Sequence, residues 1–260
     1  MLSPFNCYQR DAKKACTNAT WLRSFSCCTK SSKPTDSSSS PGKKARQKYA
    51  RKIEMRAQIK SSVRLASTML AMPLWLAYRA LSLIGNQDSV FQSFSQALSL
   101  IPGKPGIYLR ASFYTLSCPG TSIDISVGFL TVLSHWNTTI EKGVYVGPQC
   151  NIGKCTIGEN TLVGSGVHIL SGSKQHEFSD INRPIKEQSG TFTKIRIGHD
   201  CWLGNTAVVM SDIGDHCVVA AGSVVTKPTK PGLIVAGNPA RTVRSRFDHQ
   251  LLASSAEHGK

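Results

Sequence analysis

An apolar residue returns about every sixth position from Ser122 onward, and this period constrains the fold more than any other feature of the chain. The repeating positions are Ile140, Val146, Ile152, Ile157, Val163 and Ile169, then, after an insert, Ile197, Leu203, Val209, Ile213, Val219 and Val225. Most of them precede a glycine or alanine, and a small or β-branched residue such as Cys150, Thr161, Cys201 or Ser223 follows four positions later. An antiparallel sandwich would show a period of two. Short strands turning around a triangular core need an interior residue and a flexible corner at a period of six. The repeat therefore predicts a mainly β fold of coiled short strands.

One polar insert interrupts this repeat. The stretch ILSGSKQHEFSDINRPIKEQSGTFTKIRIG, residues 169–198, carries His176 near its start. Loops on a rigid scaffold often carry functional residues, although a solvated loop histidine needs no function at all. The other histidines of the repeat region, His168, His199 and His216, fall at non-apolar positions and are expected to point out of the coils.

Composition divides the chain into four parts. We predict a disordered basic tail with a Ser/Pro-rich linker over 1–44, a helical region over 45–121, the β-helical domain over 122–246 and a C-terminal tail over 247–260. The net charge is +16, of which residues 1–60, with 14 Lys/Arg against 3 Asp/Glu, contribute +11. Such a tail suits an anionic surface or simply remains solvated, and a targeting role stays open. It lacks interleaved aromatic residues, so nucleic acid is not an expected partner.

The helical region begins with a basic stretch, 45–85, whose apolar part covers only 65–78 and contains Pro73. Spanning a bilayer takes about 20 apolar residues, so a transmembrane helix is not expected. This stretch, including residues 62–84, is compatible either with binding in the membrane interface or with packing against protein. Two further helices are expected at 86–101 and 104–117. We therefore expect a cytoplasmic protein with peripheral membrane contact through 45–85 as one option.

The nine cysteines form no CxxC pair and no cluster with zinc spacing. This favours a reducing compartment, no disulfide framework and no metal site. Cys150, Cys201 and Cys217 recur at repeat positions, where they are expected to act as small apolar residues inside the coil.

Residues 122–246 resemble the hexapeptide-repeat acyltransferases, and in particular the bacterial sugar and polysaccharide O-acetyltransferases. The pattern [Ile/Val/Leu]-Gly-x-x-small-x carries this resemblance, together with IRIGHDCWLGNTAVVM (195–210), VVAAGSVVTKP (218–228) and IVAGNPARTVRSR (234–246). The resemblance implies a left-handed parallel β-helix, a homotrimer with active sites between subunits, and acetyl transfer from acetyl-CoA to a carbohydrate acceptor. Whether the acceptor atom is oxygen or nitrogen stays open, with a sugar hydroxyl favoured.

Acetyl transfer requires a base that removes the acceptor proton, and imidazole is suited to this at neutral pH. His176 is the first candidate, because the family's catalytic histidine occupies a similar loop after a coil. Asp180 or Glu177 could orient its ring, and His135 is the second candidate for the base.

The resemblance also implies coenzyme contacts. By motif and spacing, the matching residues are Trp202 at the thiol end, Ala221 and Gly222 beside the pantetheine arm, and Thr226, Lys227 and Arg244 at the phosphates. Each of them could instead be an ordinary surface residue. An asparagine that assists catalysis in some members has no match, because Pro148 stands at the best-matching position and Asn151 is offset, so the oxyanion partner stays open.

Two alternatives belong to other classes. A zinc enzyme similar to the γ-class carbonic anhydrases needs converging histidines, but the chain contains no His-x4-His, and we expect no stoichiometric metal. A non-catalytic structural or assembly protein built on the same β-helix would need neither the histidine loop nor the cationic positions near the last coil. The sequence does not identify the acceptor, because the shape of the loop and the neighbouring subunit would decide it.

Overall fold

The computed structural model describes residues 43–248; in 43–54, 56 and 57 it describes the backbone alone. Contacts divide the chain into two units, Met1–Tyr49 and Ala50–Lys260. The second unit holds every strand and all of the helical structure except the start of the first helix. The predicted tails fall almost entirely outside the described residues, so the disorder of 1–44 stays a prediction.

Helix α2 spans Lys43–Leu81 and continues through Pro73. One face of its second half packs on the unit, with Ala71 and Tyr78 buried on either side of the proline, and this packing holds the helix together where a hydrogen bond is lost. The same face is tied by Arg64, whose guanidinium pairs with Asp124. Packing against protein, one of the two interpretations of this stretch, therefore holds for this face. Among residues 43–248, no helix has the length and apolar character needed to cross a bilayer.

Two shorter helices follow, α3 (Gln87–Ser99) and α4 (Gly103–Ser117), close to the predicted ranges. Their facing sides and α2 share an aromatic cluster made of Tyr78, Phe91, Phe94, Phe113 and Tyr114. Burial within α3 does not follow apolar character alone. Ala97 is exposed, while Ser95 is buried and its hydroxyl bonds with the Tyr114 hydroxyl at 2.8 Å.

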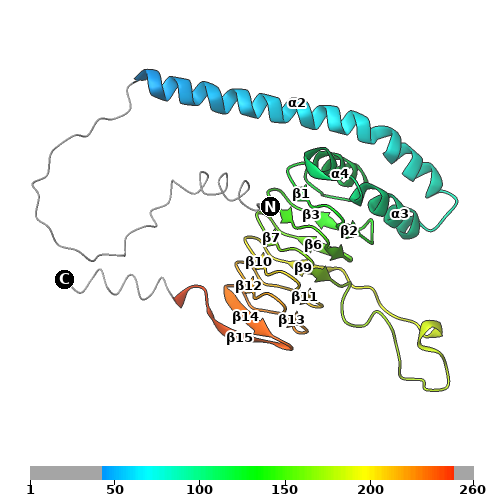
Figure 1. Ribbon diagram of the computed structural model, residues 1–260. Coiled ribbons are helices and arrows are strands. Elements are labelled where there is room, and N and C mark those ends of the chain that lie inside the picture. Colours follow the sequence, from blue (N-terminus) through cyan, green and yellow to red (C-terminus); the bar gives the residue numbers. More distant parts are fainter. Residues whose placement is uncertain (1–42, 249–260) are drawn as a thin grey trace, which may run out of the picture. The chain divides into compact units, whose positions relative to one another are not determined.

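The strands form three sheets. In the first coils each strand pairs with the third one along the chain, and in the last coils mostly with the second, because the third sheet continues there only as a bridge between Ile197 and Ile213. The first sheet contains, in order, β1 (Ser126–Val127), β4 (Tyr145–Val146), β7 (Leu162–Val163), β10 (Trp202–Leu203), β12 (Val218–Val219), β14 (Leu233–Gly237) and β15 (Ala240–Ser245). The second contains β13 (Val224–Val225), β11 (Val208–Val209), β8 (His168–Ile169), β5 (Asn151–Ile152) and β2 (Val132–Leu133). The third contains β3 (Thr139–Ile140), β6 (Cys155–Ile157) and β9 (Ile195–Ile197). Because successive turns of the chain add strands to the same sheets, the domain is a parallel β-helix (Figure 1).

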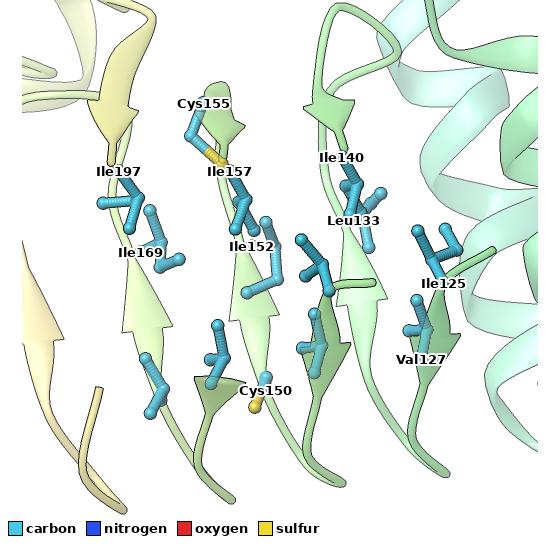
Figure 2. Packing of buried hydrophobic residues seen from close by; sticks show 14 of the residues in the cluster. Ile125, Val127, Leu133, Ile140, Cys150, Ile152, Cys155, Ile157, Ile169 and Ile197 are labelled. Atoms are coloured by element: carbon cyan, nitrogen blue, oxygen red, sulfur yellow. The ribbon is translucent and has the colours of Figure 1, made fainter. Parts of the chain in front are cut away.

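The interior of the β-helix confirms the six-residue repeat. None of the twelve repeating apolar residues has more than 2% of its surface exposed. The strand register stacks like on like, so that Val146 pairs with Val163 and Ile152 with Ile169. Figure 2 shows two such columns, one of Ile140, Ile157 and Ile197 and one of Leu133, Ile152 and Ile169. Each fully buried side chain of this size contributes about 1.5–3 kcal/mol, so the columns carry much of the folding free energy.

The cysteines of the repeat are structural. The thiols of Cys150, Cys201 and Cys217 are each 3.1 Å from a carbonyl oxygen of the next coil. Burial raises the pKa of the Cys155 thiol to about 12 and that of Cys201 to about 11, so both stay protonated at neutral pH. The cysteines among the described residues are free thiols, as expected.

The first coil has no preceding coil to satisfy its backbone, and the helices supply the missing partners. Ser95 of α3 accepts a hydrogen bond from Leu133 N at 2.8 Å. The fully buried Arg110 of α4 donates from Nε to Val127 O (3.0 Å) and from Nη1 to Leu98 O (2.9 Å) and to Ile101 O at the end of α3 (2.8 Å). Burial lowers the pKa of Arg110. The guanidinium therefore joins α3 to the open edge of the β-helix.

We expect Arg110→Met to lower the free energy of unfolding by roughly 3 kcal/mol, because the change leaves buried carbonyls without donors while keeping the side-chain stem. Urea denaturation followed by circular dichroism measures this. Arg79→Met, which alters an exposed arginine near the end of α2, is the matched control and should change stability little. Equal losses in the two variants would contradict the role given to Arg110.

Candidate functional site

The predicted insert is a loop between β8 and β9 that projects from the β-helix (Figure 1). Its two limbs pair through hydrogen bonds from Glu177 N to Ser189 O (2.8 Å) and from Thr191 N to Lys174 O (2.7 Å). At the far end, beside the short helix η1 (Ile185–Glu187), Gln188 Nε2 donates to Asp180 O at 2.8 Å. The loop is therefore a hydrogen-bonded ribbon with a defined course.

His176 lies on the first limb of this ribbon with its side chain exposed. It has no hydrogen-bond or ion-pair partner among residues 43–248, so neither Glu177 nor Asp180 orients its ring in this structure. The Asp180 carboxylate instead accepts from Asn182 N at 3.0 Å. Opposite His176, Gly190 approaches so closely that a Cβ there would lie 1.8 Å from Gln175 O and 2.9 Å from His176 N. The backbone that carries the histidine is thus placed by a contact that only glycine permits.

We expect Gly190→Ala to push the two limbs apart and displace His176. If His176 acts as the base, acetyl transfer should then fall about tenfold or more, because small misplacements of a catalytic group are costly. Steady-state kinetics with the full chain measures this, together with a thermal melt that should change little. Ser189→Ala, which removes an exposed neighbouring hydroxyl, is the control. Unchanged activity in Gly190→Ala would show that the position of His176 does not matter.

The second candidate, His135, lies under the returning limb of the loop. Its ring contacts that of Phe192, with centroids 5.4 Å apart, and its Nδ1 is buried without a hydrogen-bond partner among the described residues. Burial lowers the pKa of His135, with Asp88 acting in the opposite direction and Lys154 in the same one. Because this half-buried ring packs against Phe192, His135 supports the packing of the loop base and stays second to the exposed His176 as a candidate base.

An open groove of about 540 Å³ lies at the far end of the β-helix, beside the β14–β15 hairpin. It is lined by Val225, Lys227, Pro228, Thr229, Lys230, Leu233, Val235, Ala240, Arg241 and Thr242. Three cationic side chains, Lys227, Lys230 and Arg241, therefore border an apolar floor. Such a groove can hold an anionic ligand through charge-assisted hydrogen bonds.

The structure thus places the predicted coenzyme residues on several elements. Lys227 lines the groove, while Thr226 and Arg244 are exposed but do not line it. Ala221 and Gly222 form an exposed turn between β12 and β13, with Gly222 at φ 68°. Trp202 projects from β10 with 56% of its surface exposed.

Sequence reasoning missed two of the cations that line the groove. Lys230 was not distinguishable from other surface lysines in TKPTKPG. Arg241 reaches the groove because β15 folds back antiparallel on β14, pairing Arg241 with Ala236. That pairing could have been suspected from the turn residues Asn238-Pro239, but its register could not.

Within residues 43–248, no group of three or more His, Cys, Asp or Glu side chains is arranged to hold a metal ion. No hydrogen bond, ion pair or ring contact among these residues joins His176 to Trp202 or Lys227. A single chain therefore presents a histidine loop, an exposed tryptophan and a cationic groove as separate features.

The comparisons with known proteins identify the repeat. Residues 137–171 match the family model described as bacterial transferase hexapeptide (six repeats), and residues 194–227 match the hexapeptide repeat of succinyl-transferase. A chloramphenicol acetyltransferase of Agrobacterium fabrum (strain C58 / ATCC 33970) is 46% identical over 139 residues, or 46% of this chain. The chain spans 65% of the length of that relative.

A relative matched over nearly its whole length is WcaF of Escherichia coli (strain K12), assigned by its name to acetylation in colanic acid biosynthesis. It is 31% identical over 174 residues, which are 63% of this chain and 91% of WcaF. A galactoside acetyltransferase solved in complex with coenzyme A shares the fold, with a TM-score of 0.50, 20% identity and coverage of 64% of this chain and 86% of that one. The repeat, the three parallel sheets and these matches agree that the chain belongs to the hexapeptide-repeat acyltransferases and that its domain is a left-handed parallel β-helix.

Proposed function

We propose that the protein transfers the acetyl group of acetyl-CoA to a hydroxyl group of a sugar, in a cell-surface polysaccharide or its precursor. The observation that carries this proposal is the single interruption of the β-helix by a hydrogen-bonded loop that presents His176 exposed and unpaired. The loop presents this imidazole beside the regular coils with no partner among the described residues that would occupy its ring nitrogens.

The chemistry needs few protein groups. The imidazole of His176 accepts the proton of the acceptor hydroxyl while that oxygen attacks the thioester carbon. A tetrahedral intermediate forms, its C–S bond breaks, and the imidazolium returns the proton to the leaving thiolate of coenzyme A. The acceptor attacks directly, so no covalent acetyl-enzyme is required. A hydrogen-bond donor for the oxyanion is also needed, and no described residue of the loop is assigned to it.

The groove supports acetyl-CoA as the donor. Coenzyme A carries several phosphates and a long, neutral pantetheine arm, and Lys227, Lys230 and Arg241 offer cations beside an apolar floor. Trp202 and the turn at Ala221-Gly222 lie on the coils before this groove, where an extended arm could follow the stacked turns. A galactoside acetyltransferase of the same fold was solved with coenzyme A bound.

We infer that the working enzyme is a homotrimer. No residue of the histidine loop lines the cationic groove, and a second copy would bring its own groove to the loop of the first. The loop also exposes apolar side chains that have no cover, with Phe178 75%, Ile181 93% and Ile185 55% exposed. A neighbouring protomer is the cover that would complete both the packing and the site.

The membrane-proximal part of the proposal rests on α2. The side of α2 that does not pack exposes Leu65, Met69, Leu70, Met72 and Leu76, and basic residues precede it in the sequence. An apolar face next to Lys and Arg suits the headgroup region of a bilayer. We therefore propose contact with the inner face of the membrane, where a lipid-linked sugar precursor would be available.

A small hydroxyl-bearing antibiotic is the second candidate acceptor. It is favoured by the 46% identity to a protein named chloramphenicol acetyltransferase. The two candidates share the donor, the base and the reaction, and differ in the acceptor alone.

A transfer assay tests the proposal. The purified full chain is incubated with acetyl-CoA, the release of free coenzyme A thiol is followed, and sugars, polysaccharide fragments and chloramphenicol are supplied as acceptors. Acceptor-dependent thiol release with an acetylated sugar supports the proposal, and acetylated chloramphenicol alone supports the second candidate. Binding of acetyl-CoA without transfer to any hydroxyl or amino acceptor, or no binding at all, would favour a non-catalytic β-helix protein.

A further inference from the structure

Two histidines that lie 17 positions apart in the sequence meet on one outer corner of the β-helix. His199 lies in the turn between β9 and β10, and His216 lies in the corresponding turn one coil later, before β12. Their Nε2 atoms are 3.1 Å apart, with ring centroids 4.5 Å apart and planes inclined by 81°. The backbone N–H of His216 donates to His199 O at 2.9 Å, so the stacking of coils forms the pair.

A carboxylate lies beside the other nitrogen of each ring. Asp215 Oδ1 is 3.1 Å from His199 Nδ1, and Asp200 Oδ2 is 3.0 Å from His216 Nδ1. Each aspartate comes from the turn of the opposite histidine, so the two turns hold one another through crossed contacts. A carboxylate oxygen can accept but not donate, so the hydrogen bond to Asp200 places a proton on Nδ1 of His216. The Asp215 carboxylate lies near Nδ1 of His199 and favours a proton there through its charge.

Each carboxylate is also paired with an arginine. Arg246 Nη1 lies 3.1 Å from Asp200 Oδ2. Arg196 Nη2 lies 2.9 Å from Asp215 Oδ1, which also accepts a hydrogen bond from His199 N at 3.1 Å. These contacts hold both carboxylates beside the imidazole rings.

When each ring is neutral with its proton on Nδ1, both lone pairs sit on the Nε2 atoms, which are 3.1 Å apart. Two lone pairs at this distance repel unless a cation lies between or beside them. Histidines that bind metals have the same arrangement, with the remaining ring N–H directed to a carboxylate. Two zinc–nitrogen bonds of about 2.0–2.1 Å at a tetrahedral angle span about 3.3 Å, close to the observed separation.

We propose that His199 and His216 form a binding site for a late first-row divalent cation, of which Zn²⁺ is the representative. Imidazole nitrogen selects Zn²⁺, Ni²⁺ or Cu²⁺ over Mg²⁺ and Ca²⁺, which prefer oxygen ligands. The described residues supply two ring nitrogens and no third ligand, so water completes the coordination and the ion exchanges with solvent. No metal was expected from the sequence because it contains no zinc-binding spacing. Spacing along the chain cannot reveal two histidines that become neighbours only when the coils stack.

The site is independent of the proposed acetyl transfer. The bound ion would link two successive coils at the corner that precedes β10. Loss of the site is therefore expected to change zinc binding and the stability of that corner. Phe247, whose ring centroid is 6.3 Å from that of His216, borders the pair on one side.

Calorimetric titration of ZnCl₂ into untagged, chelator-treated full-length protein tests this site. We expect a zinc-binding event in the parent protein that weakens at least tenfold in His199→Gln and in His216→Gln. Asp200→Asn, which removes the charge behind His216, should weaken it about 10–100-fold. His168→Gln, which changes an exposed histidine on β8, should bind zinc as the parent does, and MgCl₂ should give no corresponding event.

Zinc affinity unchanged in both histidine variants, or no zinc binding by the parent protein, overturns the proposal; in the second case the two rings share a proton instead. Circular dichroism checks folding, and if one histidine variant fails to fold, the other and Asp200→Asn decide. Acetyl-CoA binding is measured in the same variants. Loss of zinc with acetyl-CoA binding retained separates this site from the proposed function.

Discussion

Replacing His176 with alanine is expected to lower kcat for acetyl transfer by about 10²–10⁴-fold, the range over which a positioned general base acts. The acceptor oxygen must then attack with its proton still attached, or wait for water to remove it. The affinity for acetyl-CoA should stay within about twofold, because charge-assisted contacts of the groove are formed by other elements. Steady-state release of free thiol and calorimetric titration of acetyl-CoA measure the two quantities separately.

Two further variants make this test specific. His176→Gln keeps a polar side chain of similar size and should be as inactive as the alanine variant, since an amide cannot take up the proton. His168→Ala, on the coil directly before the loop, should keep its activity. If His176→Ala retains kcat while a change at His135 abolishes it, the base is His135 and the loop has another purpose.

The interior of the β-helix was predictable because its signal is local and repeated. Each coil has to place an apolar residue inside at nearly the same interval, so Ile157, Val163 and Ile169 reveal the coil without knowledge of their neighbours. The loop was predictable for the same reason, as an interruption of a regular pattern. The buried Cys150 and Cys201 also followed from their repeat positions, and their raised pKa values agree with a structural role.

The features that escaped prediction all depend on contacts between distant segments. Arg241 reaches the groove only through the register of the β14–β15 hairpin, and Arg110 serves the edge of the first coil only because α4 docks there. Ser95 is buried because a tyrosine hydroxyl lies opposite, which no helical pattern can indicate. The candidate site has the same limit, since the proposed trimer would place residues of a second copy around His176.

The double substitution Lys227→Glu with Arg241→Glu is expected to weaken acetyl-CoA binding by about 10–100-fold at low ionic strength. Lys227 follows β13 and Arg241 lies on β15, and both side chains line the same groove. Reversing both charges therefore replaces attraction for the coenzyme phosphates with repulsion. The loss should appear in KM for acetyl-CoA, with kcat at saturating donor changed much less. Calorimetric titration and donor-dependent kinetics measure it.

Ionic strength separates a direct phosphate contact from a loss of fold. Screening acts over about 10 Å at 0.1 M salt, so the parent protein should bind acetyl-CoA more weakly as salt is added, while the double variant should depend on salt little or in the opposite sense. The double control Lys104→Glu with Arg79→Glu places the same charge change on exposed residues of α4 and α2, far along the chain from the groove, and should leave binding unaltered. A donor affinity that falls equally in this control would mean that the overall positive charge attracts the coenzyme. If the affinity for acetyl-CoA falls only in the groove variant, Lys227 and Arg241 bind the phosphates of the coenzyme. A specific contact depends on where the charges lie, whereas overall attraction depends only on the total charge.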